Sequence, residues 1–413
     1  MVVGLLIGMK LSFPGILLCY CLVLAIAHAK VPVSTAETLP VDQIKPGMTG
    51  EWKTVISGSS IETFRFEVLG ISRNFIGPQR DVIIAKALDE SQILSGPVAG
   101  MSGSPCYIDG KLVGAYAYGY TWPKEQAIIG ITPIADMMET LGKEEHRTPD
   151  KSRKSPSLHS TLGQSASLDD SLGKSTIGSQ SGSSAESILS PLPTPLMISG
   201  ISTQSLEAFK EDFAALGLEP VKAPLGFTSE LKAEDLQSGS PVAGVLMSGD
   251  FQFAAVGTVT WREGDQLLAF GHPFFGSGDE DMPLAPAEVI TVIQSVSRSF
   301  KLSNVGQPVG TIYQDRLTAI AGEIGPVPPM TEYAVTIHSP GNTERTFNSS
   351  IYQHRQLAPL LAAMSLMEGL TSTMEAADEH TFYTQITLDV TGHNPIELQY
   401  VGTGGMAAYQ VAR

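Results

Sequence analysis

One short stretch organises the sequence: Gly100–Pro105, which reads Gly-Met-Ser-Gly-Ser-Pro and is followed at once by the largely apolar run Cys106–Ala115. Inside that run, Asp109-Gly110 separates two apolar segments. This dipeptide is a strong signal for a two-residue hairpin turn, because both of its positions need a positive φ. The sequence therefore places Ser102 in a glycine-rich turn that leads into a buried β-hairpin.

Two interpretations of the Ser102 turn are open. Small residues on both sides of a serine let the backbone approach a substrate and direct its N–H groups at a developing oxyanion, which suits a serine nucleophile. A turn of Gly, Ser and Pro can also simply join two strands. The hexapeptide by itself favours neither interpretation.

The region around this turn, residues 39–142, predicts a small β-barrel or sandwich. Its short alternating or apolar runs are separated by Gly, Pro and Asn, and no sustained helical pattern lies between them to form βαβ units. A short amphipathic helix, Ile134–Leu141, follows Pro133 and is expected to close the domain. The strands are expected at residues 50–56, 61–69, 81–87, 111–118 and 127–132.

Composition sets two segments apart from the folded regions. Residues 1–29 contain Lys10, an apolar run and the small-x-small sequence Ala27–Ala29. We therefore expect a signal peptide that is cleaved before Lys30, export to the periplasm or the extracellular space, and no stable membrane insertion afterwards; an uncleaved anchor is the alternative. Residues 143–192 are dominated by Ser with Gly, Thr and Pro, which predicts a disordered linker.

Charge and cysteine content narrow the classes of function. The formal net charge of −16 argues against nucleic acid or anionic lipid as a partner, since both require patches of Lys and Arg. Of the three cysteines, Cys19 and Cys21 leave with the signal peptide, so the mature chain has no internal disulfide. The remaining Cys106 is expected to pack as a small apolar residue. No metal or cofactor is expected.

The chain after the linker predicts a second β unit, residues 193–329, and a C-terminal α+β region, residues 330–413. A helix is expected over Ser202–Leu216, with Ser202 or Thr203 as its N-cap. A second, apolar helix is expected over residues 357–374. Strands are expected at residues 241–246, 251–261, 288–296, 300–302 and 310–322, and then at 333–337, 346–352, 382–390 and 396–401.

A serine nucleophile needs a neighbouring base, and His272 is the best-placed candidate. It lies at the end of an apolar strand, between Gly271 and Pro273. A satisfied histidine in a protein core is the structural alternative. The other histidines leave with the signal peptide (His28), lie in the linker (His146, His159) or have polar neighbours near the end of the chain (His338, His354, His380, His393).

Two of these stretches resemble a known family. Gly100–Pro105 with its Asp109-Gly110 hairpin closely resembles the nucleophile segment of the SpoIVB-type serine peptidases, which are named after stage IV sporulation protein B. Leu268–His272 is similar to the Ala-Leu-Gly-His stretch that carries their catalytic histidine, and Gly257–Trp261 before it also fits. Together these segments and their surroundings cover roughly half of the chain.

The resemblance implies a mainly β protein with two chymotrypsin-like β-barrels, which the disordered linker would join. It also implies that Ser102 is the nucleophile, that His272 is the general base, and that the backbone N–H groups of Gly100 and Ser102 form the oxyanion hole. In this family an Asp precedes the serine motif, which makes Asp89 the candidate acid. Asp81 is the runner-up, and a surface Asp that stabilises a turn is the alternative for either.

The sequence departs from the family in two respects. Ser102 precedes His272, whereas the histidine comes first in the sporulation peptidase; triads occur in any chain order, but here the two barrels must dock to join the site. No PDZ segment is recognisable. The expected function is that of an exported serine endopeptidase acting on protein or peptide substrates through an acyl-enzyme. The alternative is a non-catalytic envelope binding or assembly protein that retains the peptidase fold.

Overall fold

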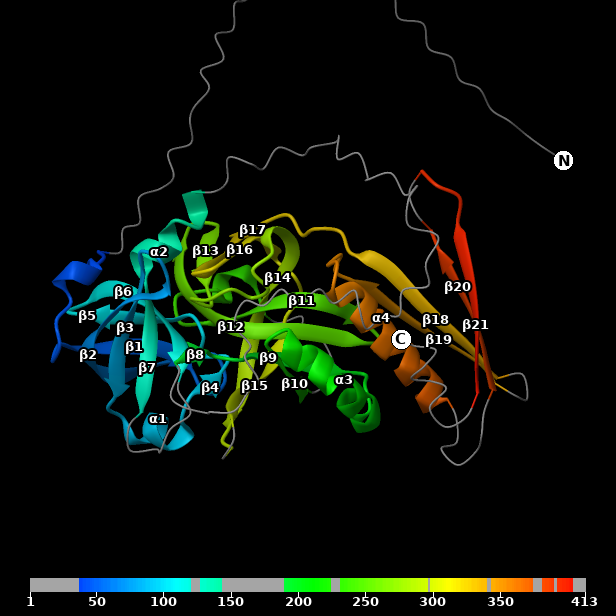
Figure 1. The fold of residues 1–413 in the computed structure, drawn as a ribbon, viewed down its shortest axis with the longest axis horizontal. Helices are drawn as coiled ribbons and strands as arrows, with labels where there is room; N and C mark the ends of the chain where they lie inside the picture. Colours follow the sequence, from blue (N-terminus) through cyan, green and yellow to red (C-terminus); the bar gives the residue numbers. More distant parts are fainter. Residues whose placement is uncertain are drawn as a thin grey trace, which may run out of the picture. The chain divides into compact units, whose positions relative to one another are not determined.

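The computed structural model describes residues 37–119, 127–142, 189–223, 231–295, 298–339, 343–373, 381–389 and 392–403. Within these residues the protein is mainly β with few helices, as the sequence predicts (Figure 1). Both the predicted signal peptide, residues 1–29, and most of the predicted linker, residues 143–188, lie outside the described residues.

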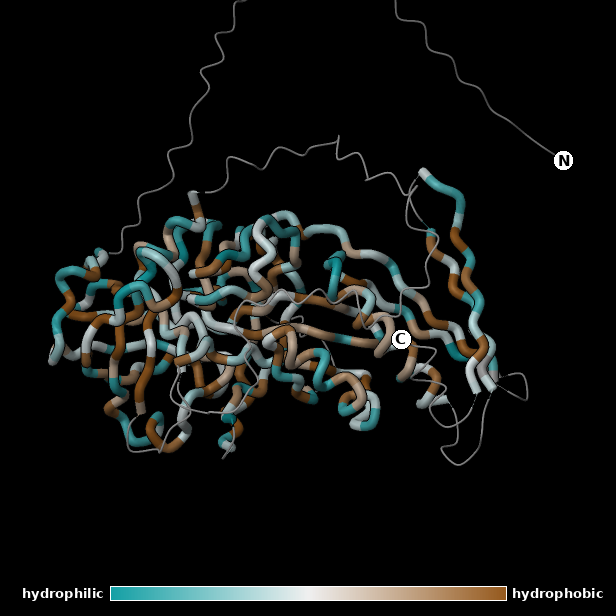
Figure 2. The backbone as a smooth tube through the Cα atoms, viewed as in Figure 1, coloured by the Kyte–Doolittle hydropathy of each residue, from teal (hydrophilic) through white to brown (hydrophobic). Residues whose placement is uncertain are grey.

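The first barrel closes from six antiparallel strands because β5 pairs with both β1 and β6. Its interior is filled by apolar side chains that include Trp52, Phe66 and Ile83, as expected for a small barrel. Hydrophobic residues recur along its strands (Figure 2). The strands are β1 (Thr49–Val55), β2 (Ile61–Gly77), β3 (Arg80–Ala87), β5 (Ser104–Ile108), β6 (Lys111–Gly119) and β7 (Ile128–Pro133).

The predicted hairpin connects β5 to β6. Asp109 has a φ of 50° and Gly110 a φ of 77°, and Ile108 faces Lys111 directly across the turn. Two positive φ values in a two-residue loop match the right-handed twist of the flanking strands. The dipeptide therefore fixes the register of the hairpin, and the prediction from Asp109-Gly110 is confirmed.

Short elements surround the barrel. The chain from β3 to β5 contains α1 (Glu90–Ser95) and the two-residue β4 (Val98–Ala99). After β7, α2 (Ile134–Met138) follows at the position predicted for the closing helix. The last residues of the predicted linker segment form β8 (Ser190–Pro191), which pairs with β6.

The second barrel also closes from six strands, because β11 pairs with β12 as well as with β14. Its strands are β11 (Pro241–Gly249), β12 (Gln252–Glu263), β13 (Gln266–Ala269), β14 (Gly278–Ile293), β16 (Gly310–Arg316) and β17 (Ala319–Ile324). Further strands extend the same sheet: β9 (Thr194–Ser199), β10 (Leu218–Lys222) and β15 (Ser299–Val305). The two predicted barrel units are thus present.

The helix α3 (Thr203–Ala215) packs beside this sheet, and Ser202 is its N-cap. The Ser202 hydroxyl oxygen accepts a hydrogen bond from the N–H of Ser205 at 3.2 Å. Such a bond satisfies one of the N–H groups that the first turn of a helix leaves without a partner. Of the two caps that the sequence allows, the structure selects Ser202 over Thr203.

The C-terminal region is α+β, as predicted. The hairpin of β18 (Thr331–Ser339) and β19 (Thr343–Ile351) joins the large sheet through β11. It is followed by α4 (Leu357–Ser372) and by a separate two-stranded sheet of β20 (Thr381–Leu388) and β21 (Ile396–Thr403). Among the helices of the described residues, none is both long and apolar enough to cross a membrane.

The two barrels dock through a shared apolar core and a shared sheet. One buried cluster combines residues of the first barrel region, such as Leu112 and Met137, with Trp261, Leu268 and Tyr313 of the second barrel. In addition, β4 pairs in parallel with β15. The described residues all lie in one compact unit, so the contacts between the barrels position whatever site lies between them.

Candidate functional site

The turn that carries Ser102 is tightly held by its own neighbours. The N–H of Met101 donates to the carbonyl of Val98 at 3.1 Å, and the N–H of Gly103 donates to the carbonyl of Tyr116 at 2.9 Å. Ser102 is only 1% exposed, and its Oγ has no hydrogen-bond partner. The structure therefore presents a fixed, buried serine with a free hydroxyl.

The second barrel holds the same turn from the other side. The N–H of Thr258 on β12 donates to the carbonyl of Ser102 at 2.8 Å, and the Thr258 hydroxyl donates to the carbonyl of Gly100 at 2.8 Å. Thr260 donates similarly to Gly103 at 2.7 Å. Three hydrogen bonds between barrels thus fix the backbone on both sides of Ser102.

His272 lies in the turn that follows β13. Phe270 has a φ of 70°, which is a strained conformation for a large side chain, and Gly271 has a φ of 71°. The carbonyl of Gly271 accepts a hydrogen bond from the hydroxyl of Thr132 on β7. The turn that carries His272 is therefore held against the first barrel, just as the turn that carries Ser102 is held against the second.

The imidazole of His272 is oriented by a backbone carbonyl. Its Nδ1 lies 2.8 Å from the carbonyl oxygen of Pro273. Because a carbonyl oxygen can only accept a hydrogen bond, Nδ1 carries the proton, and Nε2 of the neutral ring is left with a lone pair. His272 is 2% exposed and its Nε2 has no hydrogen-bond partner. The ring therefore has the tautomer that a general base requires.

Burial keeps this ring neutral. It lowers the pKa of His272 from 6.5 to about 4, and the hydrogen bond to Pro273 opposes this shift only in part. At neutral pH the imidazole is consequently available to accept a proton.

The lowered pKa of His272 predicts how the stability of the protein depends on pH. The unfolded chain binds a proton below about pH 6.5 while the folded chain resists it down to about pH 4, so acid destabilises the fold. Relative to a His272→Gln variant, we expect the free energy of unfolding of the wild type to fall by up to about 3 kcal/mol as the pH drops through this window. Denaturant titrations between pH 4 and pH 8 measure this difference, with His393→Gln as the reference for removing an exposed imidazole. A difference between wild type and His272→Gln that stays constant with pH would contradict the assignment.

The structure brings the Ser102 and His272 turns together through Thr258 and Gly103. The carbonyl of Thr258 accepts from the N–H of Phe270 at 3.3 Å, two residues before His272. A Cβ atom on Gly103 would lie 2.5 Å from that same N atom. Neither Ser102 Oγ nor His272 Nε2 has a hydrogen-bond partner, so the two are not bonded to each other in this state.

The two candidate acids, Asp89 and Asp81, pair with arginines and not with His272. Asp89 precedes α1 and accepts two hydrogen bonds from the guanidinium of Arg65, at 3.1 and 2.8 Å, and another from the Arg65 N–H. Although burial raises the pKa of Asp89, these bonds to Arg65 bring it below its usual value. Asp81 pairs with Arg73. The orienting partner of His272 Nδ1 is the Pro273 carbonyl, and neither carboxylate is bonded to this ring.

Asp315 on β16 is a residue of the site that sequence reasoning missed. Its buried carboxylate accepts hydrogen bonds from the N–H groups of Phe274, Phe275 and Gly276, at 2.8, 2.5 and 2.7 Å. Burial raises its pKa, and these backbone bonds oppose the increase. Asp315 therefore braces the loop immediately after His272. The sequence signal for it is weak: an acidic residue near the end of β16, between a glutamine and an arginine.

The other candidate residues of the sequence are Cys106 and the remaining histidines. Cys106 is fully buried in the first barrel core, as expected from the sequence, and burial raises the pKa of its thiol. His338 and His393 are exposed, and His354 is half-buried, with its Nε2 3.2 Å from Ser277 Oγ. The other histidines fall outside the described residues.

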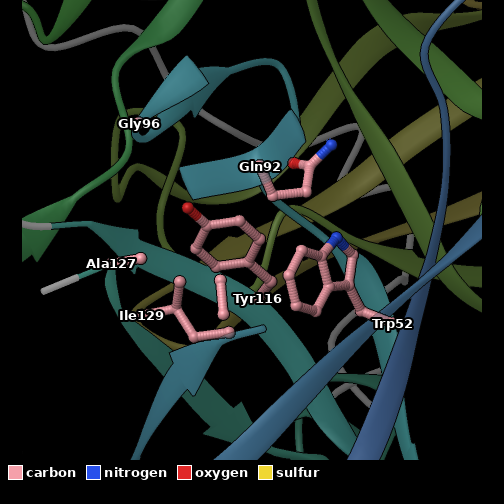
Figure 3. Close-up of a pocket in the computed structure, with 7 residues that line it drawn as sticks. Trp52, Gln92, Gly96, Tyr116, Ala127 and Ile129 are labelled. Atoms are coloured by element: carbon pink, nitrogen blue, oxygen red, sulfur yellow. The ribbon is translucent and has the colours of Figure 1, made fainter. Parts of the chain in front are cut away.

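A pocket inside the first barrel lies away from the two candidate side chains. Its lining comes from β1, β3, β6, β7 and the α1 region (Figure 3). The rings of Trp52 and Tyr116 meet edge to face, with centroids 5.9 Å apart. Neither Ser102 nor His272 lines this pocket, so it is a feature of the barrel core. The lining residues are Trp52, Ala87, Gln92, Gly96, Tyr116, Ala127 and Ile129.

Within the described parts of the chain, no three His, Cys, Asp or Glu side chains gather into a group that could hold a metal ion. Comparison of the chain with protein-family models, with curated protein sequences and with solved structures gives no match.

Proposed function

We propose that the chain is an exported serine endopeptidase of the SpoIVB type, which cleaves protein or peptide substrates through an acyl-enzyme. One observation carries the proposal. Two buried side chains from different barrels, Ser102 and His272, both have a free polar atom, and the two free groups are a hydroxyl and an imidazole nitrogen with a lone pair. Buried polar atoms are normally paired, and unpaired ones concentrate where chemistry requires them.

The proposed reaction follows from these two groups. His272 Nε2 removes the hydroxyl proton of Ser102 as Oγ attacks the substrate carbonyl, and backbone N–H groups of the turn stabilise the oxyanion. The imidazolium then donates that proton to the leaving amine, and the C–N bond breaks. Water, deprotonated by the same nitrogen, hydrolyses the ester and restores Ser102. The oxyanion role is assigned to Gly100 and Ser102; the N–H groups of Met101 and Gly103 are already occupied.

In the proposed enzyme, the Pro273 carbonyl takes the place that a carboxylate has in a common triad. It holds the ring in the tautomer that accepts a proton at Nε2. It supplies less stabilisation to an imidazolium than a carboxylate would, since the carbonyl carries no net charge. Modest turnover is therefore expected compared with a full triad.

The experiment that tests the proposal is hydrolysis of a denatured protein substrate by the purified chain. The expected result is new substrate N-termini, detected by mass spectrometry, whose formation stops when the protein is treated with a fluorophosphonate. Absence of new termini at neutral pH would contradict the proposal.

A non-catalytic binding or assembly protein is the second candidate. The observation in its favour is that Ser102 and His272 are both buried and are not bonded to each other. A substrate reaches Ser102 only if this region opens. Under this second function the chain would bind the denatured substrate and leave it intact, so the same mixture, assayed for binding and for new termini, separates the two functions.

A further inference from the structure

Lys301 on β15 is a fully buried lysine, which is rare in proteins. Its Nζ donates hydrogen bonds to Thr54 Oγ1 at 2.7 Å and to Thr258 Oγ1 at 3.2 Å. No ion pair of the described residues includes Lys301, and burial lowers its pKa to about 7. A buried amine with hydroxyl partners from both barrels calls for a reason beyond packing.

The sheet places this lysine beside the turn that carries Ser102. In the parallel pairing of β15 with β4, Phe300 lies opposite Ala99, so Lys301 comes next to Gly100. A Cβ atom on Gly100 would lie 3.3 Å from Lys301 Cβ and 3.4 Å from its Cδ. The aliphatic stem of the lysine therefore lies against the backbone of the turn.

Thr258 connects the amine of Lys301 to that backbone. Because the Thr258 hydroxyl accepts a hydrogen bond from Lys301, its own hydrogen is free to point to the carbonyl of Gly100. The N–H of Thr258 holds the carbonyl of Ser102 in the same way. Lys301 thus acts, through the Thr258 hydroxyl, on the carbonyl of Gly100, two residues before Ser102, and makes no hydrogen bond to the serine hydroxyl.

We propose that Lys301 is a positioning residue of the serine site, which orients the Ser102 turn through the hydroxyl of Thr258. The proposal rests on the proposed peptidase function. It predicts that loss of the amine misaligns the nucleophile and the oxyanion N–H groups, which lowers kcat, while substrate binding is preserved.

The test compares kcat and KM of full-length variants. We expect Lys301→Met and Thr258→Val each to lower kcat by about ten- to a hundredfold with KM changed by less than about threefold. Since both act through one hydroxyl, the double variant should lose no more than the worse single variant. Thr258→Ser retains the hydroxyl and should retain kcat within about threefold.

Two controls separate positioning from general loss of structure. Ser303→Ala changes another buried residue of β15, whose Oγ has no partner, and should leave kcat unchanged. Methionine has about the length of lysine and brings no charge into the core, so the melting temperature of Lys301→Met should not fall along with kcat. If Lys301→Met does not fold, the pair Thr258→Val and Thr258→Ser tests the same connection.

The possible failures are distinguishable. Wild-type protein that shows no cleavage dependent on Ser102 overturns the proposed function and this proposal with it. If the wild type cleaves its substrate through Ser102, the peptidase function stands and the variants test only the positioning role. That role is overturned if Lys301→Met retains kcat or if Thr258→Ser loses as much kcat as Thr258→Val. It is also overturned if the losses of kcat in the two single variants multiply in the double variant.

Discussion

Changing Ser102 to Ala is expected to lower kcat/KM for a peptide substrate by about ten-thousandfold or more, because the variant lacks the atom that forms the acyl-enzyme. The fold should be unaffected. The Ser102 hydroxyl is buried without a hydrogen-bond partner, so its removal costs no such bond and can be neutral or stabilising. Peptide hydrolysis and a thermal melt of the same preparation measure both effects.

The matched control for this change is Ser91→Ala. Ser91 is exposed on α1, in the segment that leads to the Ser102 turn, and alanine is well accepted in a helix. This variant should retain full activity. Peptidase activity that survives Ser102→Ala at the level of Ser91→Ala would remove Ser102 from the mechanism.

Changing Gly103 to Ala is expected to destabilise the protein by about 3 kcal/mol or more and to abolish activity. Gly103 has a φ of 97°, and an added Cβ would lie 1.9 Å from the carbonyl oxygen of Thr258 and 2.5 Å from the N atom of Phe270. Both atoms belong to the backbone of the second barrel. Relief of the clash would therefore have to move one barrel relative to the other and separate the Ser102 turn from His272.

Gly110→Ala isolates the conformational part of this effect. Gly110 also has a positive φ, 77°, but a Cβ there would meet nothing within 4 Å. Only the left-handed backbone conformation is penalised, by about 1–2 kcal/mol. Denaturant titration of both variants gives the comparison. Equal losses of unfolding free energy in Gly103→Ala and Gly110→Ala would show that the two barrels do not approach each other this closely at Gly103.

Local signals predicted much of the fold. Asp109-Gly110 fixed the β5–β6 hairpin, and alternation located most strands of the first barrel. Longer strands were harder to bound: β2 was expected to end at Leu69 but continues to Gly77, because its second half changes partner from β1 to β3. The first half of β14 was missed for a different reason: glycine and acidic residues at its start favour a turn locally.

The site was predicted less completely than the fold. Ser102 and His272 have short motifs, and the structure places both in turns held between the barrels, although their catalytic roles remain a prediction. Asp315, Thr258 and Lys301 carry no local motif. Their positions depend on pairings between residues far apart in the chain, such as β4 with β15, and periodicity in one sequence does not contain that information. The family resemblance pointed to Asp89, which the structure pairs with Arg65.

Mass-spectrometric mapping of a fluorophosphonate adduct tests whether Ser102 and His272, from two barrels, act as one catalytic unit. We expect a single phosphonylated residue, Ser102, in the wild type, and labelling at least about a hundredfold slower in His272→Ala, because the hydroxyl loses its base. No adduct on Ser102, or equal labelling rates in the two proteins, would contradict this expectation.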